Sequence, residues 1–181
     1  MNYPDILQPN SFEKFVIDEN EILIPKCNIE FMKWKGEPLK YTFGGKPILD
    51  FENKPMFAEL VIMNIFLNSG WNSRWIETYG KPKMKPICLT EWHDTEFRNQ
   101  VNKSINNSEI ETLLNSIAEN NDNNYGGCWD IVSWKNDKIL FSESKRTKKD
   151  FIQSTQNKWL KCSLNLGLRP ENFLMVEWKL K

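Results

Sequence analysis

The clearest hydrophobic pattern in the chain begins at Lys54. The run FAELVIMNIFLN, residues 57–68, is apolar on nearly all faces and long enough for a buried helix. Pro55 suits the first helical position, and Ser69-Gly70 suits the end of the helix. The next run, RWIETY, predicts a strand closed by Gly80-Lys81-Pro82.

The C-terminal third of the chain predicts a hairpin, a helix and a last strand. The β-type runs CWDIVSW and KILFSESKR flank the turn-like residues 135–138. Asp150 with Gln153 predicts the capped start of a helix that ends at Gly167, and NFLMVEWKL predicts a closing strand. From residue 55 the predicted order is therefore helix, strand, insertion, hairpin, helix, strand.

Two segments fall outside this order. Residues 1–50 hold short apolar pieces between prolines and glycines, and strands, loops and a short helix all remain open for them. Residues 81–126 form an insertion with a strand near ICLTEW and a helix, SEIETLLNSIAEN, that Ser108 and Glu111 would open with a capping box. A chain of 181 residues is the size of one domain, so we expect a single domain over 1–181 with these two elaborations.

Counting along the predicted hairpin places two acidic residues opposite each other. If Asn136 and Asp137 form a two-residue loop, Asp130 faces Glu143 on the neighbouring strand. Like charges so placed destabilise a sheet unless a cation joins them. Lys145 lies two residues beyond Glu143 and projects from the same face, so it supplies one positive charge.

A hard divalent cation fits this arrangement, because Mg²⁺ takes carboxylate, carbonyl and water oxygens and leaves room for a phosphate. Asp130 and Glu143 would hold it, with the Ser144 backbone carbonyl as a third ligand. Lys145 would orient or deprotonate an attacking water and stabilise the charge that develops on phosphorus. The alternative is that both acids sit at strand ends in water beside a surface lysine, and a register slip of one residue would also undo the geometry.

Residues outside the hairpin extend the candidate site. Glu59 is the sole charged residue of its apolar helix, so it either emerges at a seam exposed to water or supplies a third carboxylate. Gln156, on the first turns of the later helix, can lie close to the carboxylates. Four positive charges in residues 145–149 adjoin that helix start, where a phosphate is favoured, and Arg146, Lys148 and Lys149 are candidate contacts to an anionic polymer.

Composition narrows the class of protein further. Lys plus Arg equals Asp plus Glu at 24 each, so any nucleic-acid-binding surface must be local. The four cysteines are scattered and the chain has one histidine, which argues against zinc and for free thiols. No signal peptide and no membrane-spanning run is evident, so we expect a cytoplasmic protein without a membrane partner.

Together these residues resemble the PD-(D/E)XK nuclease superfamily, and within it the VRR-NUC-like group related to Holliday-junction resolvases. The similarity covers roughly residues 55–180 and lies in the order of Glu59, Gly126-Gly127, Asp130, the Glu143-x-Lys145 triplet and Gln156-x-x-Trp159. Trp129 stands where the superfamily name has proline.

The resemblance implies an α/β fold with a restriction-endonuclease-like α-β-β-β-α-β core, in which helices flank a mixed central sheet. It implies Mg²⁺- or Mn²⁺-dependent hydrolysis of phosphodiester bonds in nucleic acid, most simply by a DNA endonuclease. By position, Asp130, Glu143 and Glu59 would serve at the metal, Lys145 would be the catalytic lysine and Gln156 a site residue. Nucleases of this kind often pair subunits to cut two strands, so a homodimer is an open alternative.

Two other classes of function remain open from the sequence. The same fold could bind nucleic acid or a protein partner without cutting, although silent members usually lose a ligand or the lysine. Alternatively, the eight tryptophans could line a partner surface, with Trp92 and Trp134 near predicted loop ends available to stack on bases. Trp71, Trp159 and Trp178 are expected in the core.

Overall fold

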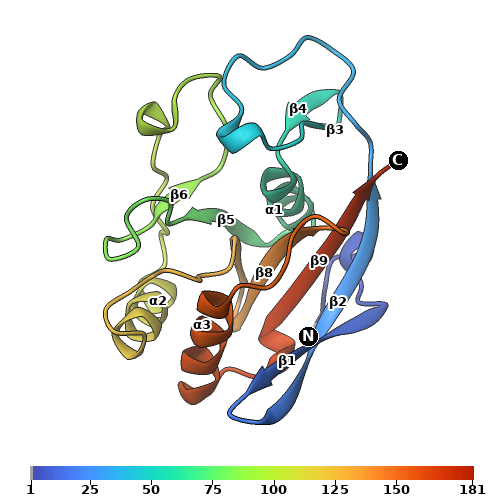
Figure 1. Ribbon diagram of the computed structural model, residues 1–181. Coiled ribbons are helices and arrows are strands. Elements are labelled where there is room, and N and C mark those ends of the chain that lie inside the picture. The colour runs from blue at the N-terminus through green and yellow to red at the C-terminus, as the bar shows by residue number, and fades with distance from the viewer. Residues whose placement is uncertain (1) are drawn as a thin grey trace.

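The computed structural model describes residues 2–181, which form a seven-stranded mixed sheet, a two-stranded hairpin and three α-helices (Figure 1). The sheet has the order β1-β2-β9-β8-β7-β5-β6. Its strands are β1 (Ser11–Ile17), β2 (Asn20–Phe31), β5 (Asn72–Glu77), β6 (Ile87–Leu89), β7 (Ile131–Lys135), β8 (Lys138–Arg146) and β9 (Phe173–Leu180). The hairpin is β3 (Leu49–Phe51) and β4 (Lys54–Met56), and the helices are α1 (Ala58–Asn68), α2 (Ser108–Asn120) and α3 (Ser154–Asn165).

The chain order of the central elements agrees with the order predicted from the sequence. From α1 the chain passes through β5, then β6 and α2, then the hairpin β7–β8, then α3 and β9. Strands β5, β7 and β8 are antiparallel neighbours, whereas β9 runs parallel to β8 after the crossover through α3. The α/β class with a mixed central sheet is therefore confirmed.

Alternating side chains of the strands divide the core into two layers. Trp75, Ile131 and Leu140 point to the face that α1 covers, and their sequence neighbours Ile76, Val132 and Phe141 point to the face that α2 and α3 cover (Figure 1). This period of two is what a sheet covered by helices on both faces requires. Because α1 and α3 lie on opposite faces, a site at the end of β7 and β8 receives residues from both.

The N-terminal segment is part of the central sheet. Strand β2 pairs in parallel with β9, and β1 forms the sheet edge beyond β2. The sequence left residues 1–50 without firm elements, because short runs such as EILIP do not reveal their partner strand. These residues thus extend the sheet next to β9, and the loop that follows them reaches the candidate site.

The predicted start of α1 and the predicted N-cap of α2 are wrong. Pro55 lies in β4, opposite Asp50, because the hairpin around Glu52 and Asn53 uses the chain as far as Met56, and α1 begins at Ala58. Helix α2 begins at Ser108 as its first helical residue, since Asn107 is the N-cap and its side chain accepts hydrogen bonds from the amides of Glu109 and Ile110. The predicted helix ends hold, with positive φ at Gly70 and Gly167.

Two expectations about composition can be compared with the structure. All four cysteines are free; Cys27, Cys88 and Cys162 are buried, and Cys128 is half-buried. Crossing a bilayer would require a longer apolar helix than any found within residues 2–181.

Candidate active site

The hairpin β7–β8 has the register that the sequence predicted. Lys135 pairs with Lys138 and Ile131 with Ser142, so Asp130, directly before β7, stands opposite Glu143. The amide of Asp130 donates to Glu143 Oε2 at 3.3 Å, and the amide of Ser144 donates to Asp130 Oδ2 at 2.9 Å. Each carboxylate therefore accepts a hydrogen bond from the backbone of the other strand, which fixes the pair side by side.

Both carboxyl groups titrate above their ordinary range. Burial raises the pKa of Asp130 well above its usual value, and the negative charges of Glu143 and Glu59 add to this shift. Burial also raises the pKa of Glu143, although Lys145 works in the opposite direction. The pair is thus unfavourable in its doubly ionised form and would gain stability from a bound cation.

Lys145 and Gln156 surround the Glu143 carboxylate. The Lys145 ammonium lies 3.2 Å from Glu143 Oε1 and donates to Gln156 Oε1 and to the Phe151 carbonyl, both at 3.2 Å. Gln156 Nε2 donates to Glu143 Oε1 at 2.5 Å. The side chain of Gln156 therefore holds the carboxylate and the ammonium in one fixed arrangement, as the sequence suggested by placing it nearby.

The start of α3 differs from the prediction. Gln153 is the N-cap, and it forms a reciprocal capping box with Gln156, so the helix begins three residues after the predicted start. Asp150 is not the cap, because its carboxylate accepts the Arg146 amide at 2.8 Å and closes the loop after β8. One consequence is that Gln156 both caps the helix and contacts the Glu143 carboxylate.

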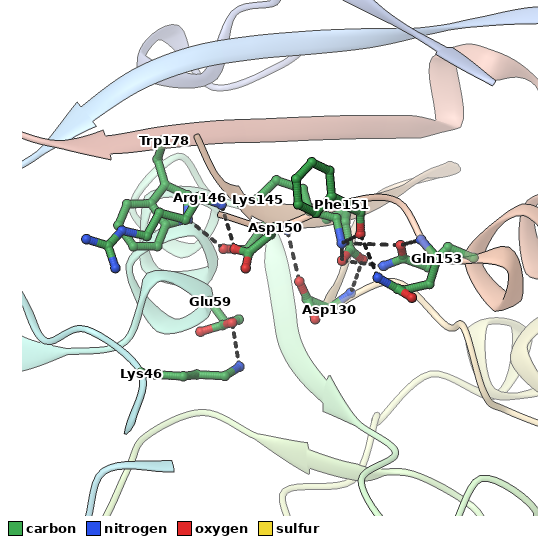
Figure 2. A network of polar contacts seen from close by, with 12 residues as sticks. Lys46, Glu59, Asp130, Lys145, Arg146, Asp150, Phe151, Gln153 and Trp178 are labelled. Carbon is green, nitrogen blue, oxygen red and sulfur yellow. Dashed lines mark hydrogen bonds and ion pairs between the residues drawn. The ribbon is translucent and has the colours of Figure 1, made fainter. Parts of the chain in front are cut away.

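Glu59 reaches the same region from α1, on the other face of the sheet. Its side chain is 8% exposed, and its Oε1 pairs with the Lys46 ammonium at 2.6 Å. Of the two positions that the sequence left open for Glu59, the structure shows the one inside a polar site. Figure 2 shows Glu59 and Lys46 to the left of Asp130, with Arg146 and Asp150 above them in the view.

A cavity of about 370 Å³ joins these groups. Four carboxylates and three cations line it, and the set is Glu59, Asp130, Glu143, Asp150, Lys46, Arg146 and Lys149. Lys148, predicted to bind nucleic acid with Arg146 and Lys149, lines an adjoining cavity of about 490 Å³ with Lys145 and Phe151. The basic segment thus borders both cavities.

Ser144 and Trp178 shape the wall of the 370 Å³ cavity. The Trp178 indole donates to the Ser144 hydroxyl at 3.0 Å, and the Arg146 guanidinium lies 5.8 Å from the Trp178 ring centroid (Figure 2). Arg146 lines the cavity, and its contact with Trp178 uses the face of the guanidinium and not its N–H donors.

The residues fit a divalent cation in part. Asp130 and Glu143 offer adjacent carboxylates with raised pKa values, and Glu59 Oε2 is buried with no hydrogen-bond partner among residues 2–181. Nevertheless, that part of the chain contains no group of three or more His, Cys, Asp or Glu side chains arranged to hold a metal ion. On the α1 side, the Lys46 ammonium already pairs with Glu59 Oε1.

Sequence reasoning missed Lys46, and it gave Gly127 a place in the motif order without a structural role. Lys46 follows two glycines in FGGKP, a pattern that occurs in many turns, and the hairpin lies more than eighty residues further along. Gly127 has a φ of 88°, and a Cβ atom there would clash with the Thr155 carbonyl at the start of α3. The paired glycines of YGGCWD were the available signal for this close approach.

The predicted aromatic surface is wrong in the main. Trp134 is 6% exposed within β7 and belongs to the core. Trp92 is half-buried, packs on Phe57 at 5.0 Å between ring centroids and donates to the Tyr41 carbonyl. Trp71, Trp159 and Trp178 are buried as predicted.

Comparisons with known proteins add no relative. No family model, no curated protein and no solved structure matches the chain. The resemblance to the PD-(D/E)XK superfamily therefore stays a prediction, supported by the order of elements and by the residues that the fold brings together.

Proposed function

We propose that the protein is a metal-dependent nuclease that hydrolyses phosphodiester bonds of nucleic acid, most simply DNA. The observation that carries the proposal is the buried, facing pair Asp130 and Glu143, next to Lys145, in a cavity that also receives basic residues. The order α1-β5-β7-β8-α3-β9 supports a restriction-endonuclease-like core, since it is the α-β-β-β-α-β order that the resemblance implies.

The chemistry of the cavity suits a phosphodiester. Arg146 and Lys149 can bind non-bridging oxygens of the phosphate, and the Asp150 carboxylate holds the loop that presents them. Asp130 and Glu143 would hold Mg²⁺ or Mn²⁺, with Glu59 and the Ser144 carbonyl available as further oxygen ligands. Such a cation, when bound, polarises the phosphate and acidifies water.

Lys145 is the group that acts on the attacking water in this proposal. Its ammonium is fixed by Glu143, Gln156 and the Phe151 carbonyl, so it cannot swing freely into solvent. From that place it orients the water and stabilises negative charge that builds up on the phosphate oxygens. Gln156 maintains the separation between the ammonium and the carboxylate, so we assign it a positioning role.

The second candidate is a silent binding module of the same fold. One observation favours it: Glu59 Oε1 is already paired with the Lys46 ammonium, so this carboxylate is not free to bind a cation. Such a module would bind nucleic acid through the basic segment and would leave it intact.

The test is incubation with plasmid, linear single-stranded DNA and branched DNA in Mg²⁺, Mn²⁺ or EDTA. We expect cleavage only with a divalent cation, and a loss of about 100-fold or more in Asp130→Ala and in Lys145→Ala. Asp137→Asn, an exposed acid in the turn of the same hairpin, and Lys83→Ala are the matched controls and should cut like the unmodified protein.

Two outcomes test the proposal, and a third shows how many copies of the protein act on the DNA. Cleavage that persists in both site variants contradicts the site assignment. Tight binding without cleavage in every metal favours the binding module. Accumulation of nicked rather than linear plasmid shows that one strand is cut at a time, whereas direct linearisation indicates that two copies act together.

A further inference from the structure

Lys46 is a half-buried cation beside the candidate metal site. Its side chain is 31% exposed, its Nζ lies 2.6 Å from Glu59 Oε1, and it sits 5.3 and 5.1 Å from the ring centroids of Phe43 and Trp75. The negative charge of Asp130 also acts on it. The ammonium is thus held by the Glu59 carboxylate and two aromatic faces, and the charge of Asp130 adds to the attraction.

Glu59 leaves one oxygen free for a further partner. The residue is 6% exposed, and its Oε2 is buried without a hydrogen bond to any of residues 2–181. A buried carboxylate oxygen without a partner is costly, so its retention in an otherwise apolar helix points to a ligand. The cavity that this helix lines contains Asp130 and Glu143.

A glycine turn directly before Lys46 positions its side chain. Gly44 and Gly45, in the short 3-10 turn Phe43–Gly45, have φ values of 62° and 74°, a region that other residues adopt at a cost. A Cβ atom at either position would meet no other atom within 4 Å. Glycine is therefore favoured there by the positive φ of the backbone, and not by a lack of room for a side chain. Phe43 anchors the turn by stacking on Phe97 with ring centroids 4.8 Å apart.

We propose that Lys46 is a tethered counter-ion of Glu59, which a divalent cation must displace before Glu59 can join Asp130 and Glu143 as a ligand. This inference rests on the proposed function. It accounts for two observations at once: Glu59 lines the cavity with Asp130 and Glu143, and yet no three acidic side chains converge as a metal site in residues 2–181. The N-terminal segment thereby sets the cation affinity of a site that the hairpin carries.

The experiment is a Mn²⁺ titration followed by electron paramagnetic resonance of the free ion, without nucleic acid. Lys46→Gln removes the competing charge a few ångströms away and should tighten Mn²⁺ binding about tenfold, which is equivalent to about 1.4 kcal/mol. Lys46→Arg keeps the charge and should stay within about twofold of the unmodified protein. Lys83→Gln, an exposed lysine elsewhere, is the control.

A double-mutant cycle shows whether Lys46 acts through Glu59. In the Glu59→Gln background the gain from Lys46→Gln should shrink to about twofold, because the competition for that carboxylate no longer exists. A gain of the same size in both backgrounds overturns the proposal, since it would reflect net charge alone. An unchanged affinity in Lys46→Gln also overturns it.

The same titration separates this inference from the proposed function. If Asp130→Asn abolishes Mn²⁺ binding and Lys46→Gln has no effect, the metal site is supported and the proposed role of Lys46 is wrong. If Asp130→Asn binds Mn²⁺ as well as the unmodified protein, the metal site itself falls. Circular dichroism of each variant checks that it is folded, and Lys46→Arg gives the folded comparison if Lys46→Gln is not.

Discussion

At the scale of single residues, Asp130 carries the most unusual chemistry. Its carboxyl is placed against Glu143 by the hairpin register, and burial with two negative neighbours raises its pKa well above the ordinary value. A raised pKa in the folded state means that ionisation is harder in the folded than in the unfolded chain. The ionised form of Asp130 therefore lowers the free energy of unfolding when no cation is bound.

The first prediction follows from the sign of this shift. In EDTA, Asp130→Asn should be more stable than the unmodified protein at pH 8 and no more stable near pH 4. The difference should grow as the pH rises from the ordinary carboxyl range of about pH 4 toward the raised pKa of Asp130. Thermal melts should show a difference of at least about 2 °C at pH 8, the shift expected for roughly 1 kcal/mol in a protein of this size.

The exposed Asp137 in the same hairpin provides the control for that prediction. Asp137→Asn should show no difference that grows with pH. If Asp130→Asn is less stable than the unmodified protein at pH 8 in EDTA, the carboxyl is not strained by burial and the electrostatic account of the pair is wrong.

The residues of the site were predictable from the sequence to different degrees. Asp130, Glu143 and Lys145 could be placed by counting along one hairpin, because a tight turn fixes register over a few residues. Lys46 could not, because it meets Glu59 through a loop whose position depends on aromatic packing with residues 92–97. Local patterns predict local neighbours, whereas this contact is a product of the tertiary fold.

At the scale of elements, the contact between the chain before β7 and the start of α3 positions the site. Gly127 has a φ of 88°, and the Gln156 amide lies 2.9 Å from the place that a Cβ atom on Gly127 would take. Gln156 also holds Glu143 and Lys145. The close approach of Gly127 to the start of α3 therefore sets the distance between the hairpin β7–β8 and the helix. The sequence predicted the helix but placed its start at Asp150, since it could not show that the Asp150 carboxylate is used by the Arg146 amide.

The second prediction uses a pair of glycines. Gly127→Ala adds both backbone strain and a clash with the Thr155 carbonyl, whereas Gly80→Ala at a φ of 71° adds strain alone, with no atom within 4 Å. We expect Gly80→Ala to cost about 1 kcal/mol of unfolding free energy and Gly127→Ala about 3 kcal/mol or more. Chemical denaturation measures both values, and equal costs would show that the close approach is not constrained.

At the scale of the whole molecule, the net charge is zero, so the basic segment 145–149 is a local concentration of positive charge. Lys plus Arg equals Asp plus Glu at 24 each, so no global field attracts nucleic acid. Arg146 and Lys149 line the 370 Å³ cavity, and Lys148 lines the adjoining one. The proposed binding of nucleic acid should therefore depend on a few local contacts to phosphates.

The third prediction concerns the salt dependence of DNA binding. Lys149→Ala and Lys148→Ala should each reduce the slope of log K against log salt by about one, the change expected when one phosphate contact is lost. Lys83→Ala changes an exposed lysine that lines neither cavity, and it should leave the slope unchanged. Fluorescence anisotropy at several salt concentrations gives the slopes, and identical values in all three variants would place the nucleic-acid interface elsewhere.

The whole fold was predictable in its central part and not at its N-terminus. The order from α1 to β9 followed from hydrophobic runs and turn residues, which are local signals. The parallel pairing of β2 with β9 joins residues about 150 positions apart, and no local pattern in residues 20–31 specifies it. That pairing carries residues 32–47 toward the site and so gives the N-terminal segment a part in it.

The central claim is that Asp130, Glu143 and Lys145 hydrolyse phosphodiester bonds with a divalent cation. The most direct measurement is the single-turnover rate of cleavage of an end-labelled DNA strand in Mn²⁺, compared between Asp130→Asn and Asp137→Asn. The account predicts a rate at least about 100-fold lower for Asp130→Asn and an unchanged rate for Asp137→Asn, with no cleavage in EDTA. Equal rates in the two variants, or cleavage that survives EDTA, would contradict it.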